Sequence, residues 1–356
     1  MAIKLGNTVT QVDENRVFIT FEAVTGQDIS FEASKELITI AAEAGADSIK
    51  FQLLEADKTM GEDAVHNYKI LVDKEKEIYE DKEEGLREVL KRRELKKEEW
   101  IDLKYFADKK GLKFFCTALF PEDVDFLVNE LNIDTIKIAS GDINNLPFMK
   151  YVSQKRVSIQ IDTGSGNLWE IERAVRVIEE KNRDIVIHHC PTGYPAKLES
   201  INLNMIPTLK LMFPDYTIAF SDHSPGWDMD IAAIALGAKM VEKTITLDRT
   251  TPCVEHCFSL EPHEAGNFVK AIRDLETALG RSSRVLPPSY LENRKRVRRS
   301  VFTRKDLAKG DELTWDNITF RRPGYGISPP DVDLFIGKKV KRDILEGQML
   351  NVNDIG

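Results

Sequence analysis

A regular alternation of short apolar segments with helical segments constrains the fold of this chain most strongly. Short runs of apolar residues without polar alternation are typical of strands buried on both faces, as in a parallel sheet. Eight such runs occur before residue 250, at 17–23, 48–52, 113–116, 135–138, 157–161, 185–188, 216–220 and 240–243. Segments of helical periodicity separate them, so the sequence predicts repeated strand–helix units.

The predicted helices alternate with these strands. They lie at 31–44, 100–110, 122–131, 147–153, 168–181, 205–212, 228–236 and 262–279. Eight units fit a (β/α)₈ TIM barrel better than an open doubly wound sheet. The first strand is not followed by a glycine-rich dinucleotide or P-loop fingerprint. Residues 53–100 interrupt the alternation, and their second half, 74–99, is so rich in Lys and Glu that we expect a solvated helix there.

The pattern changes after residue 280. Short β-like pieces separated by turns follow, among them the turn at 322–326. We therefore expect a barrel domain at 1–280, a linker at 281–298 and a small β-rich domain at 299–356. A domain of about 60 residues buries little surface, so we expect it to pack on another surface.

Composition excludes several classes of protein. The net charge of −9 argues against a nucleic-acid-binding protein, because phosphate neutralisation needs a basic surface. No apolar run reaches the length of about 18 residues that a membrane span needs. The segment from Met1 to Gly6 lacks the apolar core of a signal peptide. Four scattered cysteines do not form a disulfide framework, so a reduced, cytoplasmic protein is expected.

Polar residues collect at the ends of the predicted strands, which would converge on one mouth of a barrel. They include Glu22, Lys50, Gln52, Thr117, Lys137, Ser140, Asp162, Tyr194, Ser221, His223 and Glu242. Lys50 and Lys137 each interrupt an apolar strand, and a buried cation costs several kcal/mol unless it is paired. Two such lysines favour a site for an anionic ligand. The alternative is a pair of internal salt bridges to Glu22 and Glu242.

These residues carry a resemblance that extends over nearly the whole chain. Its most specific segments are 44–52, 137–145, 221–224, 235–243 and 322–327. The pattern is similar to the sialic acid synthase family, whose members condense phosphoenolpyruvate with an N-acylated amino-sugar to form nonulosonic acids. Residues 322–327 resemble the antifreeze-like (SAF) domain that follows the barrel in this family. The resemblance therefore implies a TIM barrel followed by a small SAF domain.

The resemblance also implies roles for individual residues. Phosphoenolpyruvate would be held by Lys50, Thr117, Lys137, Ser140 and Ser221, with Asp162 at the same site. Glu22 and Glu242 would act as acid and base or position water, and Gln52 would contact the sugar or the metal-bound water. Tyr194 and Glu255 would lie on the sugar side, and Arg322 of a neighbouring subunit would complete the site in a domain-swapped homodimer. His223 would bind a divalent metal, Mn²⁺ or Mg²⁺.

Three positions depart from the family pattern. Residues 24–29 lack the Asn and His that usually follow the first strand. Asp162 stands where the family has Ser, and a carboxylate there would repel phosphate unless it is protonated or paired with a lysine. Thr244 replaces the usual second metal-binding His, and His256 or the pair His189 and Cys190 are the alternative ligands.

Three functions remain open at this point. The first is a phosphoenolpyruvate-dependent nonulosonate synthase. The second is a lyase or aldolase that uses another donor, with Lys50 or Lys137 as a Schiff-base nucleophile. The third is a sugar-binding protein without catalytic activity.

Overall fold

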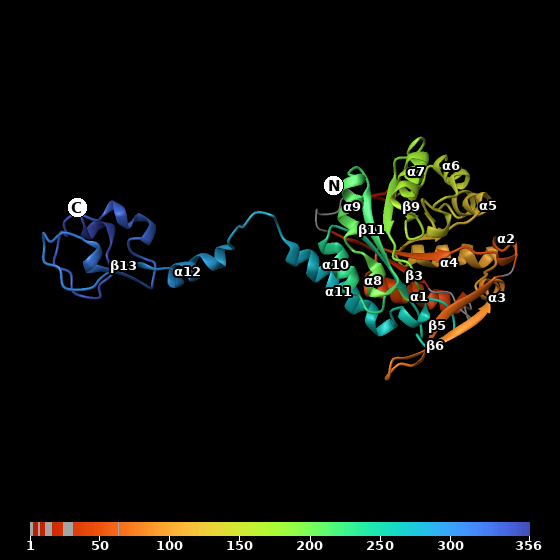
Figure 1. Cartoon of the computed structure of the whole chain (residues 1–356), viewed down its shortest axis with the longest axis horizontal. Helices are drawn as coiled ribbons and strands as arrows, with labels where there is room; N and C mark the ends of the chain where they lie inside the picture. Colours follow the sequence, from red (N-terminus) through yellow and green to blue (C-terminus); the bar gives the residue numbers. More distant parts are fainter. Residues whose placement is uncertain (1–2, 6–7, 11–15, 24–30, 63) are drawn as a thin grey trace. The chain divides into compact units, whose positions relative to one another are not determined.

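The chain divides into two compact units, residues 1–280 and residues 281–356 (Figure 1). The computed structural model describes residues 3–5, 8–10, 16–23, 31–62 and 64–356. A short antiparallel pair, β1 (Ile3–Leu5) and β2 (Thr8–Thr10), precedes the first unit's main sheet. None of the described helices is long and apolar enough to cross a membrane.

A closed barrel of eight parallel strands forms the first unit, which confirms the predicted (β/α)₈ fold. The strands are β3 (Phe18–Ala23), β4 (Ser48–Gln52), β7 (Lys113–Thr117), β8 (Thr135–Ile138), β9 (Ser158–Asp162), β10 (Ile185–His189), β11 (Thr217–Asp222) and β12 (Met240–Ile245). Neighbours along the chain pair in order, and β12 pairs with β3 to close the barrel. Almost every strand residue is buried, because helices cover the outer faces and the barrel interior is filled by side chains.

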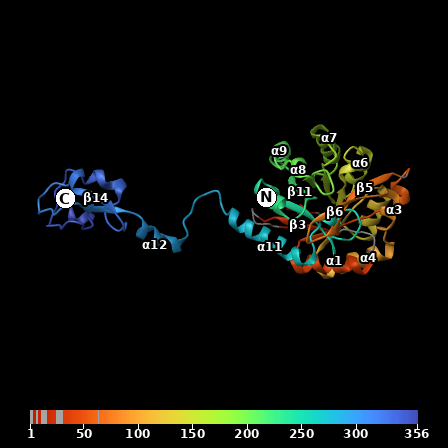
Figure 2. The ribbon, with the colours of Figure 1, turned by 60° about the horizontal axis from the view of Figure 1, so that its bottom comes forward.

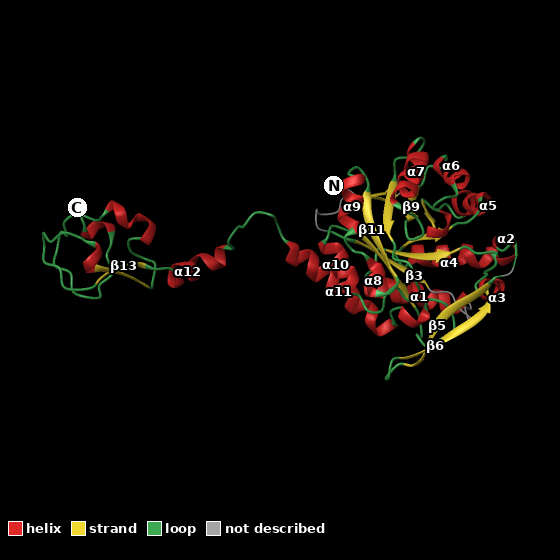
Figure 3. Ribbon diagram, viewed as in Figure 1, coloured by secondary structure: helices red, strands yellow, loops and turns green. Residues whose placement is uncertain are grey.

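Helices surround these strands (Figure 3). The main ones are α1 (Phe31–Ala44), α4 (Lys97–Lys109), α5 (Pro121–Asp125), α6 (Leu146–Ser153), α7 (Leu168–Glu179), α9 (Met205–Met212), α10 (Asp228–Ala235) and α11 (Pro262–Leu279). In Figure 2, α11, α1 and α4 run along one side of the barrel. Helix α7 shows why such segments form: Asn167 and Glu170 make a capping box, and Ile171, Val175 and Ile178 are buried on one face.

The excursion at residues 53–100 differs from the prediction. An antiparallel hairpin of β5 (Val65–Asp73) and β6 (Ile78–Gly85) stands where much of the solvated helix was expected. The prediction was wrong there because charged residues on both strands hide the strand periodicity. One face of the hairpin is nevertheless apolar: Tyr68 packs near Cys253, and Leu71 packs near Phe258. The hairpin thereby covers the loop that follows β12. Within the range 74–99, helix is limited to α3 (Leu86–Lys91) and the start of α4.

The second unit has its own small core. Strands β13 (Ser300–Thr303) and β14 (Ile318–Arg321) pair antiparallel, and ten buried residues that include Val301, Leu313 and Leu350 pack together. Helix α12 (Pro288–Val297) runs through much of the segment expected to be a linker. It is tied to the turn at 322–326, since the Gly324 N–H donates to the Lys295 carbonyl at 2.8 Å. All four cysteines of the chain are buried, lie in the barrel unit and form no disulfide.

Candidate active site

The predicted site residues, apart from Arg322, lie at the C-terminal ends of the barrel strands or in the loops that follow them. Those within strands are Glu22 on β3, Lys50 and Gln52 on β4, Thr117 on β7, Lys137 on β8, Asp162 on β9, Ser221 on β11 and Glu242 on β12. Ser140, Tyr194, His223 and Glu255 lie in the following loops, whereas Arg322 belongs to the second unit.

Glu242 is the centre of a buried network of charged side chains. Its Oε1 accepts hydrogen bonds from Lys50 Nζ at 2.7 Å and from Ser221 Oγ at 2.9 Å. Its Oε2 accepts from Lys137 Nζ at 2.9 Å. The side chain of Glu242 is only 1% exposed, so these three groups take the place of water. One carboxylate thus holds both predicted lysines in the barrel interior.

Each lysine also contacts a second carboxylate. Lys50 Nζ lies 2.8 Å from Glu22 Oε1, which also accepts a hydrogen bond from Gln52 Nε2 at 2.7 Å. Lys137 Nζ lies 3.0 Å from Asp162 Oδ1. The internal salt bridges that stood as the alternative to a ligand site are therefore present. Both lysines are held between carboxylates at the end of the barrel where ligands bind in this fold.

Protonation follows from burial and from these pairs. Burial opposes a charge on Glu242, but Lys137 and Lys50 outweigh it and hold the pKa of Glu242 well below its usual value. Burial also opposes the charge of Lys50, yet Glu22 and Glu242 raise the pKa of Lys50. For Asp162 the balance is reversed: burial raises its pKa, and Lys137 offsets this effect only in part.

Sequence reasoning missed a neutral polar pair on β9 and β10. Lys137 Nζ lies 3.4 Å from His188 Nδ1, and His188 Nε2 lies 2.9 Å from Gln160 Oε1. Burial and the nearby Lys137 lower the pKa of His188 well below its usual value, so the ring is neutral. The lysine donates to Nδ1, and Nε2–H donates to Gln160. A polar residue inside an apolar strand was the available signal, as it was for the two lysines.

Arg93 is a second residue that the sequence did not reveal. Its Nη2 lies 3.3 Å from Glu255 Oε2, and both side chains are 6% exposed. Glu255 has φ of 76°, a left-handed conformation that costs energy for a residue with a side chain and is common at functional sites. Arg93 lies in the charge-rich segment 74–99, where the density of charged residues hid any single functional one.

The remaining predicted residues make looser contacts. Thr117 is buried and stands beside Lys137 in the register of β7 and β8. Ser140 Oγ lies 3.4 Å from Ser165 Oγ, outside the lysine network. The ring centroid of Tyr194 lies 4.5 Å from that of His223, with the two ring planes tilted by 41°.

Asp222 does not join the network around Glu242. It forms an ion pair with Lys243, which also lies 3.7 Å from Asp230 on α10. Ser221 and Glu242 contact each other, and the next residue on each strand points the other way, toward the helix layer. Ser221 therefore faces the barrel interior, whereas Asp222 faces the layer behind it.

The donors near His223 do not fit a protein-held divalent metal. His223 Nδ1 lies 3.3 Å from the Pro191 carbonyl oxygen, and Thr244 offers only a hydroxyl, which has no hydrogen-bond partner among the described residues. Over the described part of the chain, three or more His, Cys, Asp or Glu ligand atoms gather only at Glu261, His263 and Glu264, at the start of α11. A neutral hydroxyl is a weak substitute for imidazole.

Of the alternative metal ligands, Cys190 lies beside His223, with its Sγ 3.9 Å from His223 Nδ1. The two histidines have hydrogen-bond partners elsewhere. His189 Nε2 lies 2.6 Å from the Ile201 carbonyl oxygen, and His256 Nδ1 lies 2.7 Å from Thr246 Oγ1. Burial and the nearby Arg93 lower the pKa of His256 to about 4. The departure at residues 24–29 lies outside the described residues.

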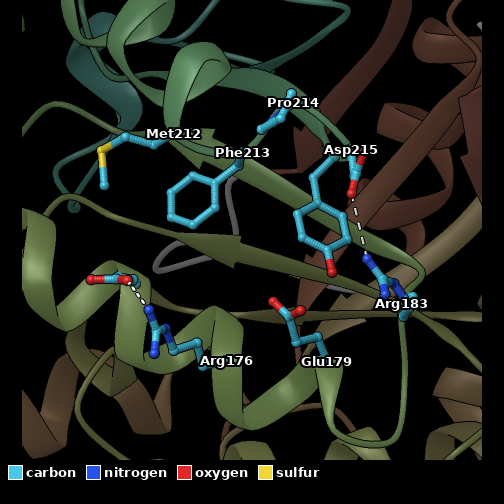
Figure 4. Close-up of a pocket in the computed structure, with 9 residues that line it drawn as sticks. Arg176, Glu179, Arg183, Met212, Phe213, Pro214 and Asp215 are labelled. Carbon is cyan, nitrogen blue, oxygen red and sulfur yellow. Dashed lines mark hydrogen bonds and ion pairs between the residues drawn. The ribbon is translucent and has the colours of Figure 1, made fainter.

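A separate cavity of about 720 Å³ lies away from this network (Figure 4). Arg183 and Tyr216 in its lining precede β10 and β11, so the cavity is at the N-terminal end of these strands. Its two arginines are already paired, Arg183 with Asp215 at 3.5 Å and Arg176 with Glu172 at 2.5 Å. The end of the barrel that holds the buried lysines is the better candidate site.

The fold and this network define a (β/α)₈-barrel enzyme with buried lysines and carboxylates at the C-terminal ends of its strands. The NeuB family matches residues 37–284, and the SAF domain matches residues 298–355. The chain therefore belongs to the NeuB family and carries a SAF domain. Named relatives are nonulosonic acid synthases, and the chain is an enzyme of this C–C bond-forming class.

Three comparisons illustrate the similarity. An uncharacterized protein of Methanocaldococcus jannaschii is 33% identical over 354 residues, which cover 99% of this chain and 98% of that protein. An N,N'-diacetyllegionaminic acid synthase of Legionella pneumophila is 31% identical over 342 residues, 94% of this chain and 93% of that enzyme. The crystal structure of an N-acetylneuraminic acid synthetase from Leptospira borgpetersenii, in complex with citrate, has a TM-score of 0.69 and 27% identity, over 81% of this chain and 94% of that one.

Proposed function

We propose that this enzyme condenses phosphoenolpyruvate with an N-acylated amino-sugar to form a sialic-acid-like nonulosonate, with release of phosphate. The observation that carries the proposal is the pair of buried lysines that share Glu242. Two cations fixed in the barrel interior suit a donor with both a carboxylate and a phosphate. The names of the relatives, which include synthases of legionaminic, pseudaminic and N-acetylneuraminic acids, support the same reaction.

Donor binding would use the lysine network. Lys50 and Lys137 would exchange part of their contact with Glu22, Glu242 and Asp162 for oxygens of the donor. Hydroxyls of Thr117, Ser140 and Ser221 would add hydrogen bonds. Because both lysines are already held in place by carboxylates, little reorganisation is needed when negative charge develops.

The reaction itself has two bond-forming steps. The enol carbon of the donor attacks the sugar aldehyde, so a C–C bond forms and the aldehyde oxygen takes a proton. Water then adds at the carbon that carries the phosphate, and phosphate leaves. Glu22 and Glu242 would move these protons or position the water, and Gln52, which donates to Glu22 at 2.7 Å, would contact the sugar.

The acceptor side would be formed by Tyr194 and by Glu255, which Arg93 holds at 3.3 Å. Arg322 of a neighbouring subunit would contact the N-acyl group, as a domain-swapped homodimer would allow. His223 remains the predicted ligand of a divalent ion, Mn²⁺ or Mg²⁺, but the donors described above do not supply a site, so no step depends on it. A cytoplasmic location also stays a prediction.

The Schiff-base alternative is less well supported. A lysine attacks a carbonyl only as the neutral amine. Lys50 and Lys137 each contact two carboxylates within 3.0 Å, and the pKa of Lys50 is raised, because Glu22 and Glu242 outweigh burial. Borohydride should therefore leave both lysines intact when pyruvate is present. No observation favours a purely sugar-binding protein over an enzyme.

The direct test is phosphate release from phosphoenolpyruvate with a panel of N-acylated amino-sugars, with and without Mn²⁺. We expect release with at least one sugar and a product that contains all carbons of both substrates. Absence of turnover across the panel would contradict the proposal. A covalent lysine adduct after borohydride would favour the aldolase instead.

A further inference from the structure

Asp162 is an acid that contacts Lys137, one of the two lysines that would bind the proposed donor. Its Oδ1 lies 3.0 Å from Lys137 Nζ and 4.0 Å from His188 Nδ1, and the residue is 8% exposed. An ionised carboxylate would repel the phosphate that its lysine partner attracts.

The groups that face Asp162 do not remove this repulsion between carboxylate and phosphate. Lys137 comes from β8, Lys50 from β4 and Glu242 from β12, and all three act on the charge of Asp162. From the β10 side, His188 is neutral, and burial keeps the pKa of the Cys190 thiol well above its usual value. Three carboxyl groups, counting Glu22, therefore share two lysines, so the two cations do not pair fully with all three acids.

We propose that Asp162 takes up one proton when the donor binds, and that its carboxyl O–H then donates a hydrogen bond to the phosphate. This inference rests on the proposed function. Lys137 turns from Asp162 Oδ1 to the phosphate, and the negative charge of the phosphate stabilises the protonated acid. Burial already raises the pKa of Asp162, with Lys137 as the main opposing influence, so loss of that contact favours protonation.

Proton uptake makes donor affinity depend on pH. Above about pH 7 the phosphate of phosphoenolpyruvate is fully ionised, because the second pKa of a phosphate monoester is about 6. If one proton is taken up, the apparent Kd for the donor rises about tenfold for each pH unit above neutrality. Pyruvate lacks the phosphate and should bind without this dependence.

The test is calorimetric titration of the full-length protein with phosphoenolpyruvate at pH 8, in buffers with different heats of ionisation. We expect about one proton taken up per donor bound by the natural protein, and about none with pyruvate. Asp162→Asn and Asp162→Ser should both abolish the uptake and flatten the pH dependence of Kd. Asp134→Asn is a matched control, because Asp134 pairs with Lys113 at 3.0 Å before the strands; it should keep the uptake.

The outcomes separate this inference from the proposed function. Donor binding by the natural protein without proton uptake would overturn the role of Asp162 and leave the synthase proposal standing, whatever the variants do. Uptake that persists in both Asp162 variants would also overturn it. Failure of phosphoenolpyruvate to bind would overturn the proposal that it is the donor, and with it the role of Asp162.

Discussion

Replacing Glu242 with Gln removes a negative charge that two buried lysines share. Lys50 and Lys137 contact this carboxylate at 2.7 and 2.9 Å, and the side chain is 1% exposed, so water does not replace the lost charge. Removal of one partner from a buried pair costs about 3–5 kcal/mol of unfolding free energy. Each lysine keeps one carboxylate, Glu22 or Asp162, and the amide oxygen still accepts a hydrogen bond. We therefore expect Glu242→Gln to lower the free energy of unfolding by about 3 kcal/mol, the lower end of this range.

The cost should depend on pH. The pKa of Glu242 lies well below its usual value of 4.5, because Lys137 and Lys50 outweigh burial. A carboxyl whose pKa is lowered on folding stabilises the folded state fully above its unfolded pKa, and this contribution is lost as the pH falls. The difference between natural protein and Glu242→Gln should thus be complete at pH 7 and shrink below pH 4.5.

Urea unfolding followed by tryptophan fluorescence measures this difference. A Trp315→Phe background confines the signal to tryptophans of the barrel unit, such as the buried Trp100. The control is Glu172→Gln, since Glu172 pairs with Arg176 at 2.5 Å on the exposed side of α7 and such pairs contribute about 0–1 kcal/mol. A loss below about 1 kcal/mol for Glu242→Gln, or one that persists in acid, would refute the reasoning.

Three further substitutions test other parts of the site. Lys137→Met should slow phosphate release about 100-fold, whereas Lys113→Met, which breaks a pair at the other end of the strands, should leave the rate nearly unchanged. Thr244→His should bind Mn²⁺ about tenfold more tightly than the natural protein in a paramagnetic resonance titration. Equal binding would contradict the conclusion that the hydroxyl of Thr244 is a weak metal ligand. Arg93→Met should raise KM for the sugar about tenfold and leave KM for phosphoenolpyruvate unchanged, because Arg93 holds Glu255. A change in KM for phosphoenolpyruvate alone would refute the role of Arg93 on the sugar side.

The barrel was predictable because its strands are apolar on both faces. Segments such as Ile185–Ile187 and Ile218–Phe220 have no polar alternation to confuse with an exposed strand, and all of these apolar residues are buried. The hairpin at 65–85 was missed for the opposite reason. Its exposed residues are charged on both strands, and only the few apolar residues beneath, such as Tyr68 and Leu71, mark the buried face.

The site was predictable only where a residue type is costly to bury. Lys50 and Lys137 stand out because a lysine inside an apolar strand needs a partner, and the partners named from the sequence, Glu22 and Glu242, are the observed ones. Arg93 was not predictable, because its position relative to Glu255 depends on the hairpin and on α3 rather than on local sequence. Pairing across distant segments is the information that a single sequence lacks.

The excess of acid over base distinguishes this network from one that serves stability alone. A buried ion pair repays its desolvation poorly, and apolar side chains of similar volume are often as stable or more so. A network kept for stability would not bury a third carboxylate beside two lysines, yet Asp162 lies 3.0 Å from Lys137 and is almost as buried as the lysine. An anionic donor makes the excess larger, so it must take lysine contacts from the carboxylates and leave one of them protonated. Under the proposed function, donor recognition and proton uptake are one event in this barrel.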